Sequence, residues 1–212
     1  MKKHALIVAG GAPPAPDLLK TEIAKADFVI AADSGADGLT GLDIIDLTLV
    51  GDFDSISPDV LAAYQGGRAA IQVSDTHKDE TDTLLAMDAA IRRGAKTITI
   101  LGALGKRLDH QYANIALLLY ARKQGVRAEL ADDTTRVFLA QKKTRITAAK
   151  GANVSVFSVT KRCTFSASTG LAYPLNGLTL YRDRPIGVSN SAEADQVTIL
   201  QKSGIALIIV SQ

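Results

Sequence analysis

Two aspartates that follow a short apolar run are well placed to do chemistry. Asp52 and Asp54 come directly after the run 47–50 and Gly51. A run of this kind predicts a buried parallel strand. Acids at the carboxyl ends of parallel strands lie where open α/β sheets bind ligands, and carboxylate oxygens suit a hard cation such as Mg²⁺. Taken alone, the stretch is equally compatible with a polar turn in which one aspartate caps the next segment.

A second acidic segment opens the helix predicted over 79–93. Asp82 stands in its first turn and Lys78 stands just before it. The N-terminus of a helix attracts anions, so Lys78 is a candidate for binding a phosphate there. An ordinary structural reading is also open, in which Asp79 is the N-cap and Asp82 completes a capping box.

The segment GALGKRLDH combines glycines with positive charge. Gly102 and Gly105 let backbone amides approach a phosphate, while Lys106 and Arg107 supply charge. Asp109 is then expected to cap the following helix. The segment is neither a Walker A loop nor a dinucleotide fingerprint. A plain glycine turn followed by a capped helix is the alternative.

These segments become more informative when they are taken together. Two carboxylates about 5 Å apart repel by about 3 kcal/mol at an effective dielectric of about 20. Four unpaired acids would burden a fold whose whole stability is about 5–15 kcal/mol. We therefore expect Mg²⁺ and the polyphosphate of a nucleotide triphosphate, with Arg107 neutralising developing charge. The expected metal-binding and catalytic acids are Asp52, Asp54, Asp82 and Asp109.

Apolar patterning predicts the elements that position these residues. Strands alternate with helices through the first 133 residues, which indicates a doubly wound, mainly parallel sheet. Strands are expected over 5–9, 28–32, 47–50, 69–73, 97–101 and 126–130, and helices over 17–25, 58–64, 79–93 and 109–123.

The second part of the chain, 134–212, has a different pattern. Helical periodicity is absent and turn signals separate short runs rich in β-formers, which predicts an antiparallel β-sandwich or barrel. The expected strands are 136–140, 153–159, 164–166, 178–181, 196–201 and 205–210. Two loops there, around Thr169-Gly170 and Ser189-Asn190, carry hydroxyl and amide groups that suit a small polar ligand. Ordinary turn chemistry explains them as well.

Composition argues against several classes of protein. With 24 basic and 22 acidic residues, no Trp and 5% aromatics, the chain offers neither the charge nor the stacking surfaces expected for nucleic-acid binding. One cysteine, Cys163, allows no internal disulfide, which fits a reducing cytoplasm. The apolar run 5–9 is too short for a signal peptide, and no apolar stretch reaches membrane-spanning length.

Together the motifs resemble the thiamine pyrophosphokinase (thiamine diphosphokinase) family. They occur in the family's order and spacing over nearly the whole chain, and Lys106 stands where the family commonly has a glycine. The matching segments are AADSGAD at 31–37, GDFDS at 51–55, KDETD at 78–82, GALGKRLDH at 102–110, STGLAYPL at 168–175 and GVSN at 187–190.

The resemblance implies a fold, an activity and a set of ligands. It implies an α/β nucleotide domain (1–133) and a β-sandwich domain (134–212) that binds thiamine and forms a homodimer. The reaction implied is ATP plus thiamine giving AMP and thiamine diphosphate, with the four acids holding Mg²⁺ and polyphosphate. It further implies that Asp33 and Gly35 lie along the nucleotide, and that Thr169, Gly170, Ser189 and Asn190 lie near thiamine.

Other functions remain open at this point. The same acidic edge would serve a pyrophosphokinase for another alcohol, such as a pterin methanol. A non-catalytic nucleotide-sensing module would need fewer acids, and a metal phosphohydrolase would be expected to add metal-binding histidines. Either Asp82 or Asp109 is a candidate to accept the hydroxyl proton.

Overall fold

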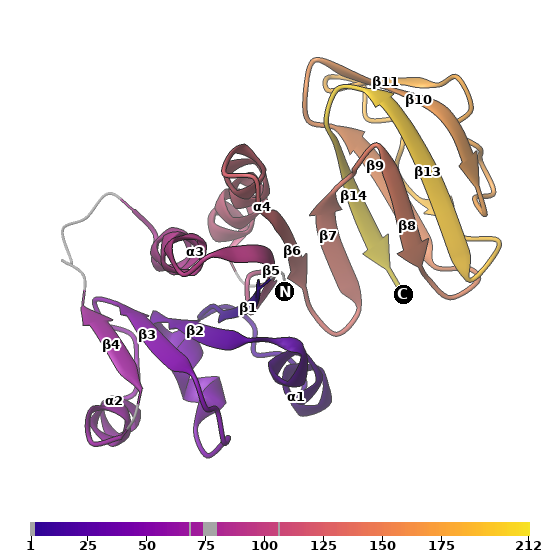
Figure 1. Ribbon diagram of the computed structural model, residues 1–212. Coiled ribbons are helices and arrows are strands. Elements are labelled where there is room, and N and C mark those ends of the chain that lie inside the picture. Colours follow the sequence, from indigo (N-terminus) through magenta and orange to yellow (C-terminus); the bar gives the residue numbers. More distant parts are fainter. Residues whose placement is uncertain (1–2, 68, 74–79, 106) are drawn as a thin grey trace. The chain divides into compact units, whose positions relative to one another are not determined.

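The computed structural model describes residues 3–67, 69–73, 80–105 and 107–212 (Figure 1). The chain divides into two compact units, Met1–Asp133 and Thr134–Gln212. Lys78, Asp79 and Lys106, which the sequence suggested for phosphate binding or capping, lie outside the described residues.

The first unit is a six-stranded parallel sheet with helices on both faces. Its strand order is β6-β5-β1-β2-β3-β4. Because the chain proceeds from β1 to β4 on one side and then crosses to β5, the sheet has a topological switch point between β1 and β5. The strands are β1 (Lys3–Val8), β2 (Phe28–Ala32), β3 (Leu47–Gly51), β4 (Ala70–Val73), β5 (Ala95–Leu101) and β6 (Arg127–Ala131).

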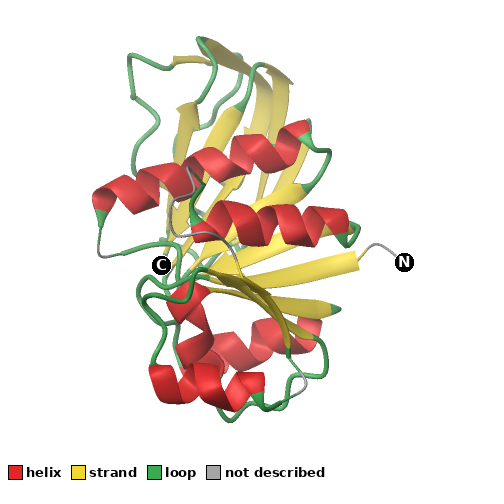
Figure 2. Ribbon diagram, turned by 90° about the vertical axis from the view of Figure 1, so that its left-hand side faces the viewer, coloured by secondary structure: helices red, strands yellow, loops and turns green. Residues whose placement is uncertain are grey.

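Helices cover this sheet because its central strands are apolar on both faces. Every residue of β2 and β3 is buried, as parallel strands between two helical layers require. The helices are α1 (Pro16–Lys25), α2 (Pro58–Gln65), α3 (Asp82–Arg92) and α4 (Leu108–Lys123), and a 3₁₀-helix, η1 (Asp33–Leu39), follows β2. Figures 1 and 2 show α1 and α2 on one side of the strands, and α3 and α4 on the other.

The helix starts differ from expectation at two places. Helix α3 begins at Asp82, and its N-cap is Thr81, whose hydroxyl accepts the Leu84 N–H at 3.3 Å. Helix α4 begins at Leu108 with Arg107 at the N-cap and no side-chain cap bond, so the expected capping role of Asp109 is wrong. The reason is that Asp109 lies inside the first turn, where its carboxylate bonds to Arg107 instead.

The second unit is a sandwich of two antiparallel sheets around one apolar core. The first sheet has the order β12-β9-β14-β7 and the second β11-β10-β13-β8. Alternate residues point inward, so Val156 and Ile208 of one sheet share a core with Phe165 and Ile199 of the other. The strands are β7 (Thr135–Leu139), β8 (Lys143–Thr147), β9 (Asn153–Ser158), β10 (Arg162–Thr169), β11 (Thr179–Tyr181), β12 (Asn190–Ser191), β13 (Gln196–Ser203) and β14 (Ala206–Ser211).

The predicted fold class, a doubly wound α/β unit followed by an antiparallel sandwich, is confirmed. Strands β8 and β12 were not expected. β8 has only two inward residues, Thr144 and Ile146, between exposed polar ones, and β12 is two residues long, so neither gives a readable apolar pattern. None of the described helices is long and apolar enough to span a membrane.

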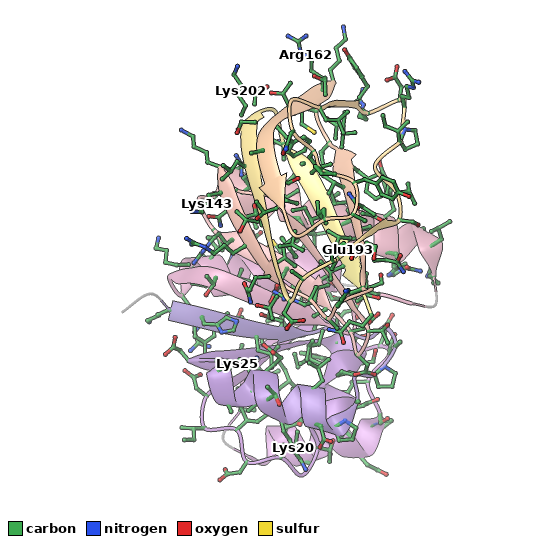
Figure 3. All side chains as sticks on the ribbon, turned by 90° about the vertical axis from the view of Figure 1, so that its right-hand side faces the viewer. Lys20, Lys25, Lys143, Arg162, Glu193 and Lys202 are labelled. Carbon is green, nitrogen blue, oxygen red and sulfur yellow. The ribbon has the colours of Figure 1, made fainter. Side chains whose placement is uncertain are left out.

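Charge is divided unequally between the two units. Residues 134–212 contain ten Lys and Arg but three Asp and Glu, whereas 1–133 contain fourteen and nineteen. The sandwich is therefore strongly basic and the α/β unit is acidic. Figure 3 shows Arg162 and Lys202 projecting near one another at one end of the sandwich, with Lys143 farther along it.

Candidate active site

A cavity of about 350 Å³ opens at the carboxyl ends of β1, β2, β3 and β5. It therefore lies at the switch point of the sheet, where this class of fold binds its ligands. The N-terminal ends of α3 and α4 complete its walls. The lining residues are Ala9, Gly10, Gly11, Ala32, Asp33, Ser34, Asp52, Asp54, Ser55, Thr81, Asp82, Thr83, Gly102, Ala103, Gly105, Arg107, His110 and Asn114.

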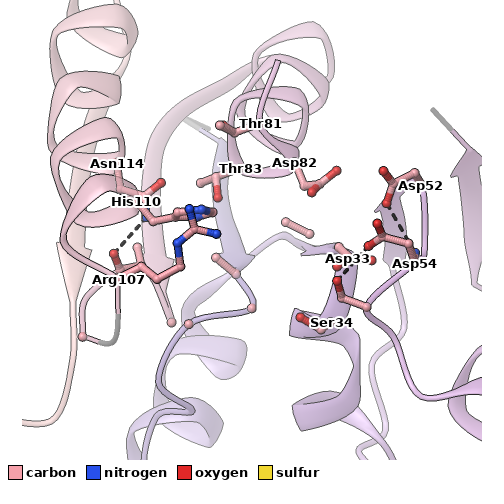
Figure 4. Close-up of a pocket in the computed structure, with 18 residues that line it drawn as sticks. Asp33, Ser34, Asp52, Asp54, Thr81, Asp82, Thr83, Arg107, His110 and Asn114 are labelled. Atoms are coloured by element: carbon pink, nitrogen blue, oxygen red, sulfur yellow. Dashed lines mark hydrogen bonds between the residues drawn. The ribbon is translucent and has the colours of Figure 1, made fainter. Parts of the chain in front are cut away.

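Three aspartates form an acidic cluster in this cavity. Asp33 follows β2, and Asp52 and Asp54 follow its neighbour β3, so the pairing of these strands brings the three together. One carboxylate oxygen from each lies within 4.8 Å of the others. The Asp54 N–H donates to Asp52 Oδ1 at 3.3 Å, and a positive φ of 61° at Phe53 allows the tight turn between them. The cluster is shown in Figure 4.

Asp33 is the most constrained member of the cluster. It has a φ of 47°, the residue is 8% exposed, and its Oδ1 has no hydrogen-bond partner among the described residues. Burial raises the pKa of its carboxyl, and the nearby charges of Asp82, Asp54 and Asp52 raise the pKa further, against a bond from the Ser34 amide. A buried acceptor without a partner beside two other acids fits the oxygen set that a divalent cation needs.

Of the four acids expected to converge, the structure brings three to this cavity. Asp52, Asp54 and Asp82 line it. Asp109 is not among the described lining residues. Its carboxylate accepts two hydrogen bonds from the guanidinium of Arg107, with Nε to Oδ1 at 3.2 Å and Nη2 to Oδ2 at 2.5 Å. This bond holds the pKa of Asp109 below its usual value. Asp109 is therefore outside the cluster that Asp33 forms with Asp52 and Asp54, and its expected role in binding metal stays a prediction.

The opposite wall of the cavity carries the basic groups. Figure 4 places Arg107 and His110 across from Asp52 and Asp54. Arg107 is exposed although it bonds Asp109, so its guanidinium has donors left for a further anion. The cavity thus has an acidic side suited to a cation and a basic side suited to phosphate.

The glycine loop after β5 forms the floor between these walls. Gly102 has a φ of 67°, and a Cβ there would lie 2.2 Å from the Ala9 carbonyl oxygen. The Gly11 N–H donates to the Gly102 carbonyl at 2.8 Å, and Asn114 Nδ2 donates to the Ala103 carbonyl at 2.9 Å. The predicted phosphate-loop residues Gly102 and Gly105 both line the cavity.

Gly35, expected along the nucleotide, has a packing role in the structure. It is buried in η1 and is not among the described lining residues. A Cβ at this position would lie 2.1 Å from the Val8 carbonyl oxygen, so only glycine lets η1 approach β1 this closely.

Several lining residues were missed by the sequence reasoning as site residues. The motifs do not single out Ser34, Thr83, His110 or Asn114 as site residues, although all four line the cavity. For Asn114 a signal exists, since it is a polar residue on the apolar side of α4, beside Leu117 and Leu118. A polar residue at such a position needs a bonding partner.

The four residues predicted near thiamine all belong to the sandwich. Their two segments lie side by side, because the Ala172 N–H donates to Ser191 O and the Glu193 N–H donates to Gly170 O, both at 2.9 Å. Thr169 is exposed at the end of β10 and Ser189 is exposed with a φ of 55°.

Asn190 differs from the other three in being buried, with 6% exposed. Its Oδ1 accepts the Tyr173 N–H at 3.0 Å and its Nδ2 donates to the Tyr173 carbonyl at 2.6 Å. The amide therefore holds the backbone of the loop that carries Tyr173, a residue that is 72% exposed.

Comparison with known proteins identifies the family. Residues 19–130 match the family model "Thiamin pyrophosphokinase, catalytic domain", and residues 141–206 match "Thiamin pyrophosphokinase, vitamin B1 binding domain". The first match spans more than half of the chain. The chain belongs to the thiamin pyrophosphokinase family.

Individual relatives of this family are similar over nearly the full length. A thiamine pyrophosphokinase of Bacillus subtilis is 28% identical over 208 residues, covering 97% of both chains. Its crystal structure superimposes with a TM-score of 0.85 and 27% identity, covering 99% of each chain. A thiamin pyrophosphokinase from Geobacillus thermodenitrificans gives a TM-score of 0.83 and 26% identity, covering 99% of this chain and 97% of that one.

More distant structures share the fold. The thiamin pyrophosphokinase of Candida albicans has 19% identity and a TM-score of 0.83, covering 99% of this chain and 89% of that one. The two family-model matches confirm the predicted membership of the thiamine pyrophosphokinase family.

Proposed function

We propose that this chain is a thiamine diphosphokinase, which transfers the pyrophosphoryl group of ATP to the hydroxyethyl oxygen of thiamine and releases AMP. The observation that carries the proposal is the cavity in which Asp33, Asp52 and Asp54 face a basic wall across a glycine loop. Both family-model matches support the choice of thiamine as the acceptor.

The acidic cluster is our candidate for binding Mg²⁺. Asp33, Asp52 and Asp54 supply carboxylate oxygens at mutual distances that one cation can satisfy. When bound, Mg²⁺ would neutralise charge on the phosphate oxygens of the transferred and leaving groups. The Oδ1 of Asp33 has no hydrogen-bond partner in the described part of the chain, which supports this assignment because a buried carboxylate oxygen is costly without one.

The remaining cavity groups act on the substrate. Arg107 and the amides of the loop 102–105 would hold the polyphosphate in line with the attacking hydroxyl. The thiamine oxygen attacks the β-phosphorus, the bond to the α-phosphate oxygen breaks, and AMP leaves. Asp82 is our candidate to accept the hydroxyl proton, because it lines the cavity at the first turn of α3.

The proton-transfer role is tested by comparing Asp82→Asn and Asp52→Asn. If Asp82 is the base, its replacement lowers kcat and removes the acidic limb of the pH profile, while Asp52→Asn mainly raises the Mg²⁺ requirement. An unchanged pH profile with weaker Mg²⁺ binding for both variants would leave Asp82 with a metal-binding role alone.

We further propose that thiamine binds at the sandwich and that two copies associate. Thr169, Gly170, Ser189 and Asn190 would contact thiamine or shape its site. The opposite net charges of the two units favour contact between the α/β unit of one copy and the sandwich of another. Sedimentation at low and high salt tests this, since a dimer held partly by charge weakens as salt rises.

A cytoplasmic location fits the single, buried Cys163.

A product assay tests the proposed function directly. The purified protein is incubated with ATP, Mg²⁺ and thiamine, and the nucleotide and thiamine products are separated. AMP and thiamine diphosphate in equal amounts are expected, and a chelator should abolish both. ADP with thiamine monophosphate, or free phosphate without a thiamine product, would contradict the proposal. A parallel incubation with a pterin methanol tests the other acceptor class.

A further inference from the structure

Asn114 is a buried polar residue on the inner side of α4. It is 7% exposed and lies one turn before Leu117 and Leu118, which pack in the core. A buried amide is tolerated when its hydrogen bonds are made. Its Nδ2 makes one to the Ala103 carbonyl at 2.9 Å, so it ties α4 to the glycine loop (Figure 4).

Two consecutive carbonyls of the glycine loop are held by the protein itself. The Gly102 carbonyl accepts the Gly11 N–H, and the Ala103 carbonyl accepts Asn114 Nδ2. Because the C=O and N–H of a trans peptide point in opposite directions, fixing these carbonyls also fixes the N–H groups of Ala103 and Leu104. Both carbonyl oxygens are thereby kept in hydrogen bonds within the protein. A carbonyl oxygen turned toward the cavity would instead repel a phosphate.

We propose that Asn114 is a positioning residue for nucleotide phosphate, which sets the loop 102–105 in its anion-binding form through the Ala103 carbonyl. This inference rests on the proposed function, since it assumes that the loop receives the polyphosphate of ATP. Asn114 also lines the cavity, one turn after His110, so the same side chain supports the loop and faces the ligand space.

The chemistry requires an amide at this position. A leucine side chain in place of Asn114 would have a similar shape but no donor, and the Ala103 carbonyl would lose its partner in a buried place. An ionised carboxylate of the same shape accepts hydrogen bonds but cannot donate one. It would place a negative oxygen against the Ala103 carbonyl oxygen and repel it. Gly102 and Gly105, with φ of 67° and 81°, are free to take other conformations once the carbonyl is released.

The test compares Asn114→Leu with Tyr120→Phe, a control on the same helix. Tyr120 Oη donates to Asp88 Oδ1 at 2.6 Å between α4 and α3, away from the cavity, so its loss weakens α4 without touching the loop. Three quantities are measured for each variant: the deuterium exchange of the amides in 102–105, the Kd of ATP with Mg²⁺ by calorimetry, and the KM for thiamine.

The proposal predicts a selective defect. Asn114→Leu should speed exchange in 102–105 without nucleotide and weaken ATP binding about tenfold, with the thiamine KM changed less than about twofold. Tyr120→Phe should leave all three close to the unmodified protein. Equal ATP affinity in both variants, or equal losses for ATP and thiamine, would overturn the proposal.

Two further readouts keep the inference testable. In the unmodified protein ATP must protect the amides of 102–105 from exchange, and the absence of protection overturns the proposal even if Asn114→Leu does not fold. If the product assay finds no thiamine diphosphate but ATP binding still depends on Asn114, the proposed function fails while the positioning role stands.

Discussion

Replacing Asp33 by Asn should stabilise the metal-free protein and weaken its binding of Mg²⁺ at the same time. Asn keeps the shape of the side chain and tolerates the φ of 47° found at this position. It removes a buried charge whose carboxylate oxygen lies within 4.8 Å of those of Asp52 and Asp54. The expected effect therefore separates a site built for a cation from an acidic turn built for stability.

The magnitude follows from the distances in the cluster. Two unit charges 4.8 Å apart repel by about 3.5 kcal/mol at an effective dielectric of about 20. Asp54 is exposed and Asp52 is partly exposed, so solvent screening reduces this, and we expect a net gain of about 2 kcal/mol. For a chain of this size such a gain raises the Tm by about 4–8 °C.

The assay is thermal unfolding in chelator and across a Mg²⁺ titration, with Asp43→Asn as the control. Asp43 is exposed and outside the cavity, so its replacement should change neither curve. The unmodified protein should gain Tm with Mg²⁺, because a ligand bound by the folded state stabilises it, and Asp33→Asn should gain little. The reasoning would be refuted if Asp33→Asn had a lower Tm in chelator than the unmodified protein and gained as much Tm with Mg²⁺ as that protein does.

The same experiment has a signed pH dependence. The pKa of Asp33 is raised above its ordinary value of 3.8, so the folded state binds this proton more tightly than the unfolded state does. Its contribution to stability is therefore present at low pH and is lost as pH rises through the raised pKa. In chelator, the Tm of Asp33→Asn should exceed that of the unmodified protein most near neutrality. This difference should shrink as the pH is lowered from neutrality toward 3.8.

Three further substitutions test other parts of the structure. Gly35→Ala should destabilise the protein by about 3 kcal/mol or more, because its Cβ would meet the Val8 carbonyl, whereas Gly38→Ala, with nothing within 4 Å of its Cβ, should be close to neutral in denaturant unfolding. Asp109→Asn should leave the Mg²⁺ titration of activity unchanged and raise the KM for ATP, because Arg107 loses the carboxylate that orients its guanidinium; a loss of Mg²⁺ affinity would place Asp109 among the metal ligands. Asn190→Ala should raise the KM for thiamine more than that for ATP, since the Tyr173 backbone loses both bonds, and equal effects on both substrates would contradict this.

The sequence predicted the fold well because its signals are local and repeated. Buried apolar runs such as 28–32 and 47–50 correspond to β2 and β3 with the expected bounds to within one residue. Strand β8 escaped because its two inward residues are too few to form a pattern. The start of α3 was placed too early because acids before Asp82 imitate a capping signal, while the actual cap is Thr81.

The composition of the acidic cluster could not be read from motif spacing alone. The sequence places Asp109 there because it follows β5, but the guanidinium of Arg107, two residues earlier, donates a hydrogen bond to its carboxylate. Asp33 was assigned to the nucleotide, since nothing local shows that its φ is positive or that β2 pairs with β3. The roles of Thr169, Gly170, Ser189 and Asn190 toward thiamine stay predictions.

The close approach of Gly102 to Ala9 and of Gly35 to Val8 limits how this enzyme can be redesigned. At these positions backbone packs directly against backbone, so a side chain cannot be added, and glycine has no side chain to shorten. A change of acceptor alcohol would have to come from the cavity walls, such as Thr83 and His110, or from the sandwich loops. Libraries aimed at new acceptors should therefore leave the glycines fixed and vary those positions.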